Sequence, residues 1–167
     1  MPEFLRSLGA HERLAALGIA IVALSLLLPW YGINFAGGLV KTPLGAFGFI
    51  EVAILVTLAA AAYLIARTER GRELPHPLHI GTLIAAAGAW TAVLVAYRIF
   101  DRPDFGPEAG PLSAERVGLR YGIFIALAGA ALIVAGGLRR RREELAADEA
   151  HDPDRRGAEG EEKRTGE

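Results

Sequence analysis

The feature that most constrains this chain is the apolar run from Gly48 to Ala66. A membrane-spanning helix needs about 20 mostly apolar residues, and this run approaches that length. The run also contains one acid, Glu51, close to its start. A carboxylate is costly to place in hydrocarbon, so it needs a cationic partner, a wet cavity or a proton. The run therefore predicts a membrane helix and makes Glu51 the first candidate for a special role.

Three other apolar stretches resemble this run in length and composition. Hydrophobic residues make up 52% of the chain, and most charges lie at its ends or between the apolar stretches. This distribution is typical of a lipid-embedded bundle. We therefore expect an all-α fold, a four-helix transmembrane bundle within residues 1–142. The expected spans are about 14–30, 48–66, 78–100 and 118–138.

The segments between the spans carry turn and strand signals. Residues 31–35 and 39–42 flank a glycine pair, which predicts a small β-hairpin-like loop on the outer side. The segment from Asp101 to Val117 holds three prolines, so we expect an irregular loop there, with Ser113 capping the fourth helix. Residues 2–13 fit either a short amphipathic helix in the membrane interface or a frayed terminus.

Beyond the fourth span the composition changes. Residues 143–167 are rich in charge and have almost no large apolar side chain after Leu145. Such a segment cannot bury enough surface to fold alone. We expect the helix to continue a turn or two past the membrane, followed by a disordered cytoplasmic tail.

The distribution of arginine predicts the orientation. Arginines cluster before the first span, between the second and third, and after the fourth (Arg6 and Arg13; Arg67, Arg70 and Arg72; Arg139–Arg142). Because cytoplasmic segments carry an excess of basic residues, both termini are expected in the cytoplasm. The surplus of arginine over lysine is typical of a high-GC bacterium, so the expected location is the plasma (inner) membrane, as a multi-pass protein.

This topology places Glu51, Arg98 and Arg120 near the outer face at similar depth. The three form a candidate intramembrane polar cluster, in which Glu51 stays ionised. Helical phase suggests an alternative. At about 100° per residue, both arginines point away from the small-residue faces of their helices, so they could instead snorkel to headgroups. Glu51 points inward, near the face of Ala59 and Ala62, which favours a structural role over proton handling.

Other residues are assigned from their position in the spans. Trp30 and Tyr31, at the outer end of the first span, are expected to be interface anchors, and Trp90 is expected in the core. The inner basic cluster, Arg139, Arg140, Arg141 and Arg142, fixes the fourth span and could bind anionic headgroups. His76 and His79 could share a metal ion, but no cysteine or carboxylate at ligand spacing completes the set, so no metal site is predicted.

Several short motifs resemble those of small four-span membrane proteins of actinobacterial type. They are Leu26-Leu-Leu-Pro-Trp-Tyr31, Phe49-Ile-Glu-Val-Ala-Ile-Leu55 and Leu119-Arg-Tyr-Gly122. The resemblance covers the chain up to Leu138 and implies the four-span layout, but no activity or site. Claudin-like four-span proteins share the gross layout, but their outer-loop cysteine pair is missing because the chain contains no cysteine.

The function expected from these features is not enzymatic. The absence of cysteine excludes thiolate catalysis and disulfides. No nucleophile can be paired with a base, no glycine-rich phosphate loop follows a strand, and no cofactor is predicted. We expect a structural or accessory component that scaffolds or modulates partners in the cell envelope. The alternative is a small transporter or channel subunit that uses Glu51. The expected partners are the bilayer and a membrane protein or a second copy of the chain, with no nucleic acid.

Overall fold

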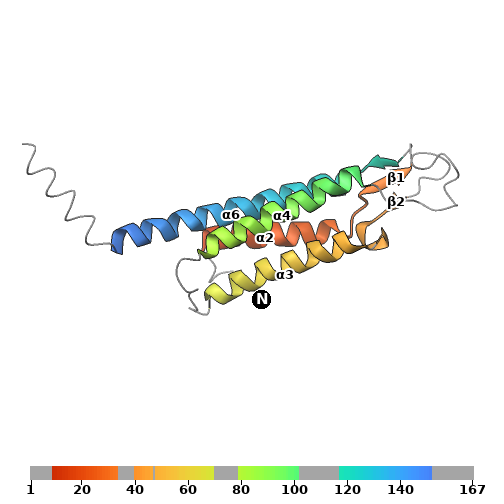
Figure 1. Cartoon of the computed structure of the whole chain (residues 1–167). Coiled ribbons are helices and arrows are strands. Elements are labelled where there is room, and N and C mark those ends of the chain that lie inside the picture. The colour runs from red at the N-terminus through yellow and green to blue at the C-terminus, as the bar shows by residue number, and fades with distance from the viewer. Residues whose placement is uncertain (1–8, 34–39, 47, 70–78, 102–116, 152–167) are drawn as a thin grey trace, which may run out of the picture.

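The computed structural model describes residues 9–33, 40–46, 48–69, 79–101 and 117–151. Within these residues, four α-helices lie lengthwise beside one another and a small sheet closes one end (Figure 1). The helices are α2 (Ala10–Ser25), α3 (Phe49–Glu69), α4 (Ile80–Phe100) and α6 (Tyr121–His151), and a short 3-10 helix, η1 (Pro43–Ala46), precedes α3.

Three of these helices, α3, α4 and α6, are long and apolar enough to cross a membrane. The 21 residues of α4 rise about 32 Å at ~1.5 Å per residue, which matches the hydrocarbon core of a bilayer. The helix α2 is shorter, with 16 residues. The first span was predicted to run to Trp30, but the helix ends at Ser25, so the predicted bounds are wrong there.

The early end of α2 has a local cause. Leu27 and Leu28 donate backbone hydrogen bonds to Leu24 and Ser25, at 3.0 Å each, in a tight turn. Pro29 has no N–H to continue the helix. The indole N–H of Trp30 then donates to the carbonyl of Ser25 at 2.8 Å, which satisfies one of the carbonyls left open at the helix end.

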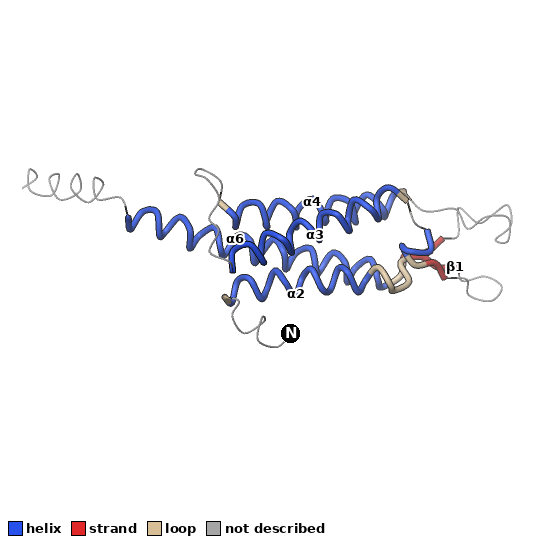
Figure 2. Tube along the Cα trace, turned by 90° about the horizontal axis from the view of Figure 1, so that it is seen from below, coloured by secondary structure: helices blue, strands red, loops and turns tan. Residues whose placement is uncertain are grey.

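The sheet lies at one end of the bundle, which we call the strand end (Figure 2). Its strands are β1 (Tyr31–Ile33), β2 (Val40–Lys41) and β3 (Val117–Leu119), in the order β2-β1-β3. The predicted pair of outer strands is present, and β1 and β2 are antiparallel with Tyr31 opposite Lys41. Residues 34–39, where the glycine turn was predicted, lie outside the described residues.

The strand β3 was not predicted. Val117, Gly118 and Leu119 pair antiparallel with β1, where a loop and then the start of a helix were expected. The backbone N–H of Arg120 extends the pairing by donating to the carbonyl of Trp30 at 2.8 Å. The last helix therefore begins at Tyr121 and not at Gly118. Ser113, its predicted cap, lies outside the described residues.

Small residues allow α6 to pack closely against both α2 and α4. A Cβ built on Gly18 of α2 would lie 2.6 Å from the carbonyl oxygen of Gly129, and one built on Gly137 would lie 2.8 Å from that of Gly81. Ala85 and Gly88 of α4 are also buried. Close approach of backbones at small residues is the usual way in which membrane helices associate. The small-residue face predicted for the third span meets Gly137 of α6, whereas Gly129, from the face predicted for the fourth span, meets α2.

The helix α3 packs on the bundle by a different stripe. Its buried residues recur at spacings of three and four: Glu51, Ile54, Leu58, Ala61 and Ile65. The prediction that the alanine face of α3 points inward is wrong, because Ala59 and Ala62 are exposed. The larger branched side chains fill the space between α3 and its neighbours better than alanine does.

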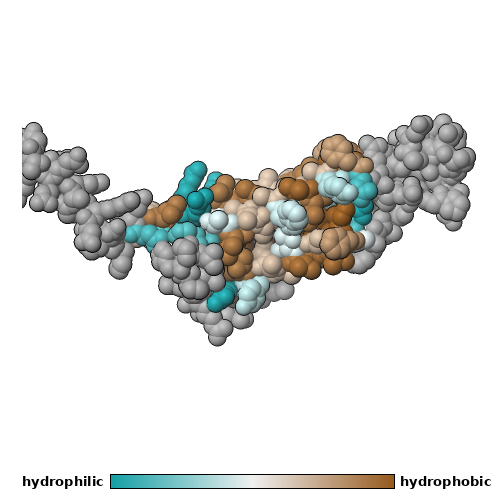
Figure 3. Space-filling view, viewed as in Figure 1, coloured by the Kyte–Doolittle hydropathy of each residue, from teal (hydrophilic) through white to brown (hydrophobic). Residues whose placement is uncertain are grey.

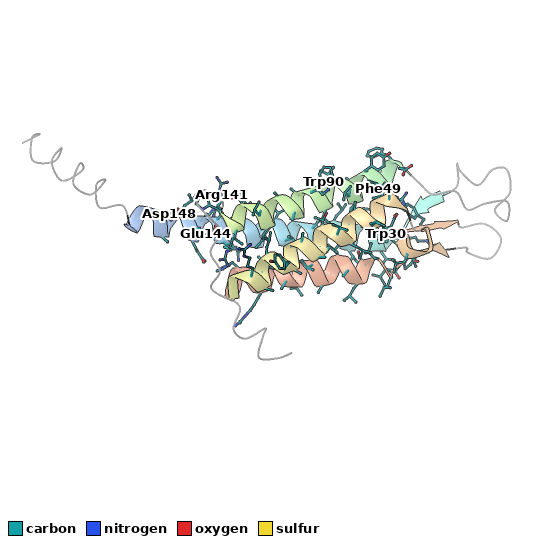
Figure 4. All side chains as sticks on the ribbon, turned by 60° about the horizontal axis from the view of Figure 1, so that its bottom comes forward. Trp30, Phe49, Trp90, Arg141, Glu144 and Asp148 are labelled. Atoms are coloured by element: carbon teal, nitrogen blue, oxygen red, sulfur yellow. The ribbon has the colours of Figure 1, made fainter. Side chains whose placement is uncertain are left out.

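On the face shown in Figure 3, the middle of the bundle is mostly apolar and hydrophilic residues lie toward both of its ends. Trp90 lies on this outer surface with 55% of its area exposed, so its predicted place in the core is wrong (Figure 4). Exposed aromatic residues also occur at the strand-end termini of three helices: Phe49, Tyr97, Phe100, Tyr121 and Phe124. An outward apolar surface with aromatic residues near one boundary is typical of a membrane domain.

At the opposite end α6 continues to His151, beyond the other helices (Figure 1). We call this the arginine end, because it holds Arg139–Arg142. The helix was predicted to continue a turn or two past the membrane, which is confirmed, but the disordered tail was predicted from residue 143 and residues 143–151 are helical. Glutamate, leucine and alanine, which dominate this segment, are good helix formers. Residues 152–167 and 1–8 lie outside the described residues, with the rest of the predicted tail and most of the predicted N-terminal segment.

Candidate functional site

The first polar cluster lies at the strand end and is built around Glu51, in the first turn of α3. The backbone N–H of Gly48 donates to Oε2 of Glu51 at 2.9 Å. This contact across three residues is the glutamate half of a capping box, and it turns the carboxylate back toward the helix start. Only 1% of Glu51 is exposed. Its negative charge also lies at the positive end of the helix dipole.

Arg98, in the last turn of α4, binds the other oxygen of this carboxylate. Its Nε and Nη2 donate to Oε1 of Glu51 at 2.8 and 2.5 Å. Its Nη1 donates to Oδ2 of Asp101 at 3.1 Å. Hydrogen bonds between charged groups are among the strongest in proteins. We call Glu51, Arg98 and Asp101 the Arg98 cluster.

The structure therefore brings Glu51 and Arg98 together, and the snorkelling alternative is wrong for Arg98, which is 7% exposed. The buried stripe of α4 passes through Thr91, Val95 and Arg98, at spacings of four and three. This spacing drifts slowly around a helix, as in coiled coils, and carries Arg98 inward. The helical-phase argument compared Arg98 with the alanines of α4 and so missed this stripe.

Arg120 occupies a different position at the strand end. It joins β3 to α6, and its guanidinium lies against Gly32 of β1, where a built Cβ would be 3.0 Å from the guanidinium carbon. Its position thus supports the sheet, while the contact with Glu51 is made by Arg98.

Trp30 and Tyr31 are buried, so the prediction that they are membrane-interface anchors is wrong. The Tyr31 hydroxyl donates to the carbonyl of Arg98 at 2.8 Å, and the Trp30 ring donates to Ser25. Buried tyrosine and tryptophan usually place their polar atom on a partner in this way. The two residues attach the sheet to α4 and α2, beside the Arg98 cluster.

A second polar cluster lies at the arginine end and was not predicted. Arg140 of α6 donates through Nη1 to Glu12 of α2, and through Nε to Oε1 of Glu144 at 2.9 Å. Glu144 also accepts from the backbone N–H of Gly81, at 3.1 Å to Oε2 (Figure 4 labels Glu144). We call Arg140, Glu12 and Glu144 the Arg140 cluster. It connects α2, α4 and α6.

A signal for this cluster was present in the sequence. Ile133, Gly137, Arg140 and Glu144 follow each other at spacings of four, three and four, so the inward stripe of α6 continues past its apolar part. Glu12 in turn accepts from the backbone N–H of Gly9 at 3.0 Å, as the acid of a capping box does. Treating Arg139–Arg142 as one basic run concealed the inward position of Arg140.

The histidines do not form a metal site in the described part of the chain. His79 precedes α4, with Nδ1 3.9 Å from Oε2 of Glu144. His76 lies outside the described residues. Among the residues that the structure describes, no group of three metal-ligating side chains is found. His11 lies 3.0 Å from Glu143, between Nδ1 and Oε2.

Neither cluster resembles the arrangement of a hydrolase or transferase, in which a nucleophile lies beside a base. In the Arg98 cluster both oxygens of Glu51 accept hydrogen bonds, and in the Arg140 cluster the acids surround a single arginine. Both arrangements join helices to one another. A comparison of the chain with models of known protein families and with curated proteins found no match.

Proposed function

We propose that this chain is an integral membrane protein without enzymatic activity, a structural or accessory component that scaffolds or modulates partner proteins in the cell envelope. The observation that carries the proposal is that Glu51 is buried and fully hydrogen-bonded within the bundle. This acid is the one ionisable group near the start of the apolar part of α3, and both of its oxygens are occupied by Arg98 and Gly48. Glu51 joins the start of α3 to the end of α4 through these hydrogen bonds.

The alternative, a transporter or channel subunit, needs a carboxylate that can exchange its partner for an ion or a proton. Glu51 is 1% exposed. The residues that follow it on the inward stripe of α3 are Ile54, Leu58, Ala61 and Ile65, all apolar. A charged substrate moving from Glu51 along this stripe would therefore lose its hydration without compensation. These features favour the structural role.

Replacement of both members of the ion pair tests this role. A buried ion pair can often be exchanged for apolar residues with little loss of stability. We expect Glu51→Leu with Arg98→Leu to accumulate in the membrane, to retain the complexes that the wild-type protein forms on crosslinking in native membranes, and to rescue a deletion strain. Val56→Leu, on the exposed face of α3, is the matched control. A double variant that accumulates normally but fails to rescue would support transport through Glu51 and contradict the proposal.

The proposal includes a topology in which the chain crosses the membrane four times, with both termini in the cytoplasm. α2 and the turn after it would form the first crossing, and the sheet would lie outside. The excess of arginine at one end of the bundle supports this orientation. Reporter fusions after Arg72 and after Arg142 should report the cytoplasm, and one after Gly38 the outside. Any fusion on the other side would refute this topology.

A further inference from the structure

The four consecutive arginines of α6 are not equivalent. Arg140 is partly buried and binds Glu12 and Glu144. Arg139, Arg141 and Arg142 are exposed. Among the described residues these three take part in no ion pair, whereas Arg98 and Arg140 each bind two acids. One arginine of the run is therefore engaged in the bundle, and three are directed to its surface.

The two acids that follow the arginine run in the sequence contact other groups. Glu143 lies 3.0 Å from His11, between Oε2 and Nδ1. Glu144 accepts from Arg140 and from the backbone of Gly81. Within the described part of the chain, three guanidinium charges on one turn of α6 thus have no acidic partner. Charges of one sign this close repel each other, so an external anion would stabilise them.

The depth of this turn indicates which anion is available. The apolar part of α6 ends at Leu138, which is itself exposed, and Arg139 follows directly. A helix that crosses a bilayer brings such a turn to the level of the phosphate groups. Guanidinium groups bind phosphate oxygens with paired hydrogen bonds, and they keep their charge at all physiological pH values.

We propose that Arg139, Arg141 and Arg142 bind the phosphate groups of anionic phospholipids, and that Arg140 has no part in this binding. The inference rests on the proposed membrane location and adds a lipid class and the residues that select it. Arg140 fails to contribute because its Nη1 and Nε donate to Glu12 and Glu144. The basic run thus divides into one residue that holds helices together and three that bind lipid.

Thermal unfolding of the full chain in a neutral detergent tests whether lipid binding depends on Arg139, Arg141 and Arg142 and not on Arg140. A ligand that binds only the folded state raises the melting temperature. We expect added phosphatidylglycerol to raise the melting temperature, and phosphatidylcholine to leave it unchanged. The triple variant Arg139→Gln, Arg141→Gln, Arg142→Gln loses the mutual repulsion of these charges, so without lipid it should melt no lower than the wild type, and it should lose the phosphatidylglycerol-dependent rise.

Arg140 provides the matched control. Arg140→Gln should lower the melting temperature without lipid and retain the rise with phosphatidylglycerol. Arg140→Lys, which keeps the charge but not the two directed bonds, serves the same purpose if the glutamine variant does not fold. The proposal is overturned if the triple variant keeps the full rise, if Arg140→Lys loses it, or if phosphatidylcholine or inorganic phosphate produces an equal rise.

These results do not depend on which side of the membrane holds the arginine end, because the protein is in detergent. Failure of the lipid proposal would leave the reporter fusions and the rescue experiment unaffected. A failed rescue would in turn leave the lipid-dependent melting unaffected. The two proposals can therefore fail separately.

Discussion

Gly129→Leu should prevent the bundle from assembling. A Cβ built on Gly129 would lie 2.8 Å from Cγ2 of Val22 and 2.9 Å from the carbonyl oxygen of Gly18. A leucine adds three more carbons in the same direction, and the backbone of α2 would have to move away. Overpacking within a core costs about 1–3 kcal/mol, and we expect this variant to exceed that range because it displaces backbone.

The measurement is the amount of protein in the membrane fraction, followed by the melting temperature of whatever can be purified. Gly118→Ala is the control, because a Cβ there would lie 3.6 Å from its nearest neighbour, an ordinary contact. It should accumulate and melt like the wild type. A Gly129→Leu protein with wild-type abundance and melting would show that α2 and α6 do not approach as closely as described.

Arg98→Gln should be the most damaging single change among the charged residues at the strand end. It removes the two donors that hold Oε1 of Glu51 and leaves that carboxylate buried with one backbone partner. Breaking a buried ion pair by removing one partner typically costs about 3–5 kcal/mol. The loss should appear as a large drop in the melting temperature of the purified protein.

Glu51→Gln should lower the melting temperature less than Arg98→Gln does, because Arg98 has a second acidic partner. Without the Glu51 charge, Arg98 still binds Asp101, whose side chain is about half exposed. Glutamine also keeps an oxygen that can accept from Gly48 or Arg98. The two single variants are therefore unequal, and Glu51→Gln should retain more of the wild-type stability. Equal losses, or a greater loss for Glu51→Gln, would contradict the described geometry.

Much of the helical layout followed from the sequence, because long apolar runs leave few alternatives. The predicted spans 48–66 and 78–100 agree closely with the apolar parts of α3 and α4. The small-residue faces of α4 and α6 were also recognised correctly, since only small side chains allow backbones to approach closely. The inward orientation of Glu51 was predicted, although the face of α3 to which it belongs was not.

Several of the remaining errors come from contacts between segments distant in sequence. The strand β3 forms because β1 offers it a partner, and Val117-Gly118-Leu119 is too short to show the alternating pattern of a strand. Trp30 and Tyr31 are residue types typical of interface anchors, but the Tyr31 hydroxyl binds the carbonyl of Arg98, 67 residues away, inside the protein. Arg140 binds Glu12, which is 128 residues away in the chain, and no local feature of the sequence names that partner.

The central claim is that Glu51 serves the structure through its bond with Arg98. A double-mutant cycle of Glu51→Gln and Arg98→Gln, read as the free energy of unfolding in detergent, tests it most directly. The double variant leaves neither residue as a buried charge without its partner. Its loss of unfolding free energy should therefore be smaller than the sum of the two single losses by at least about 1 kcal/mol. Additive losses would mean that Glu51 and Arg98 are stabilised independently, and would contradict the claim.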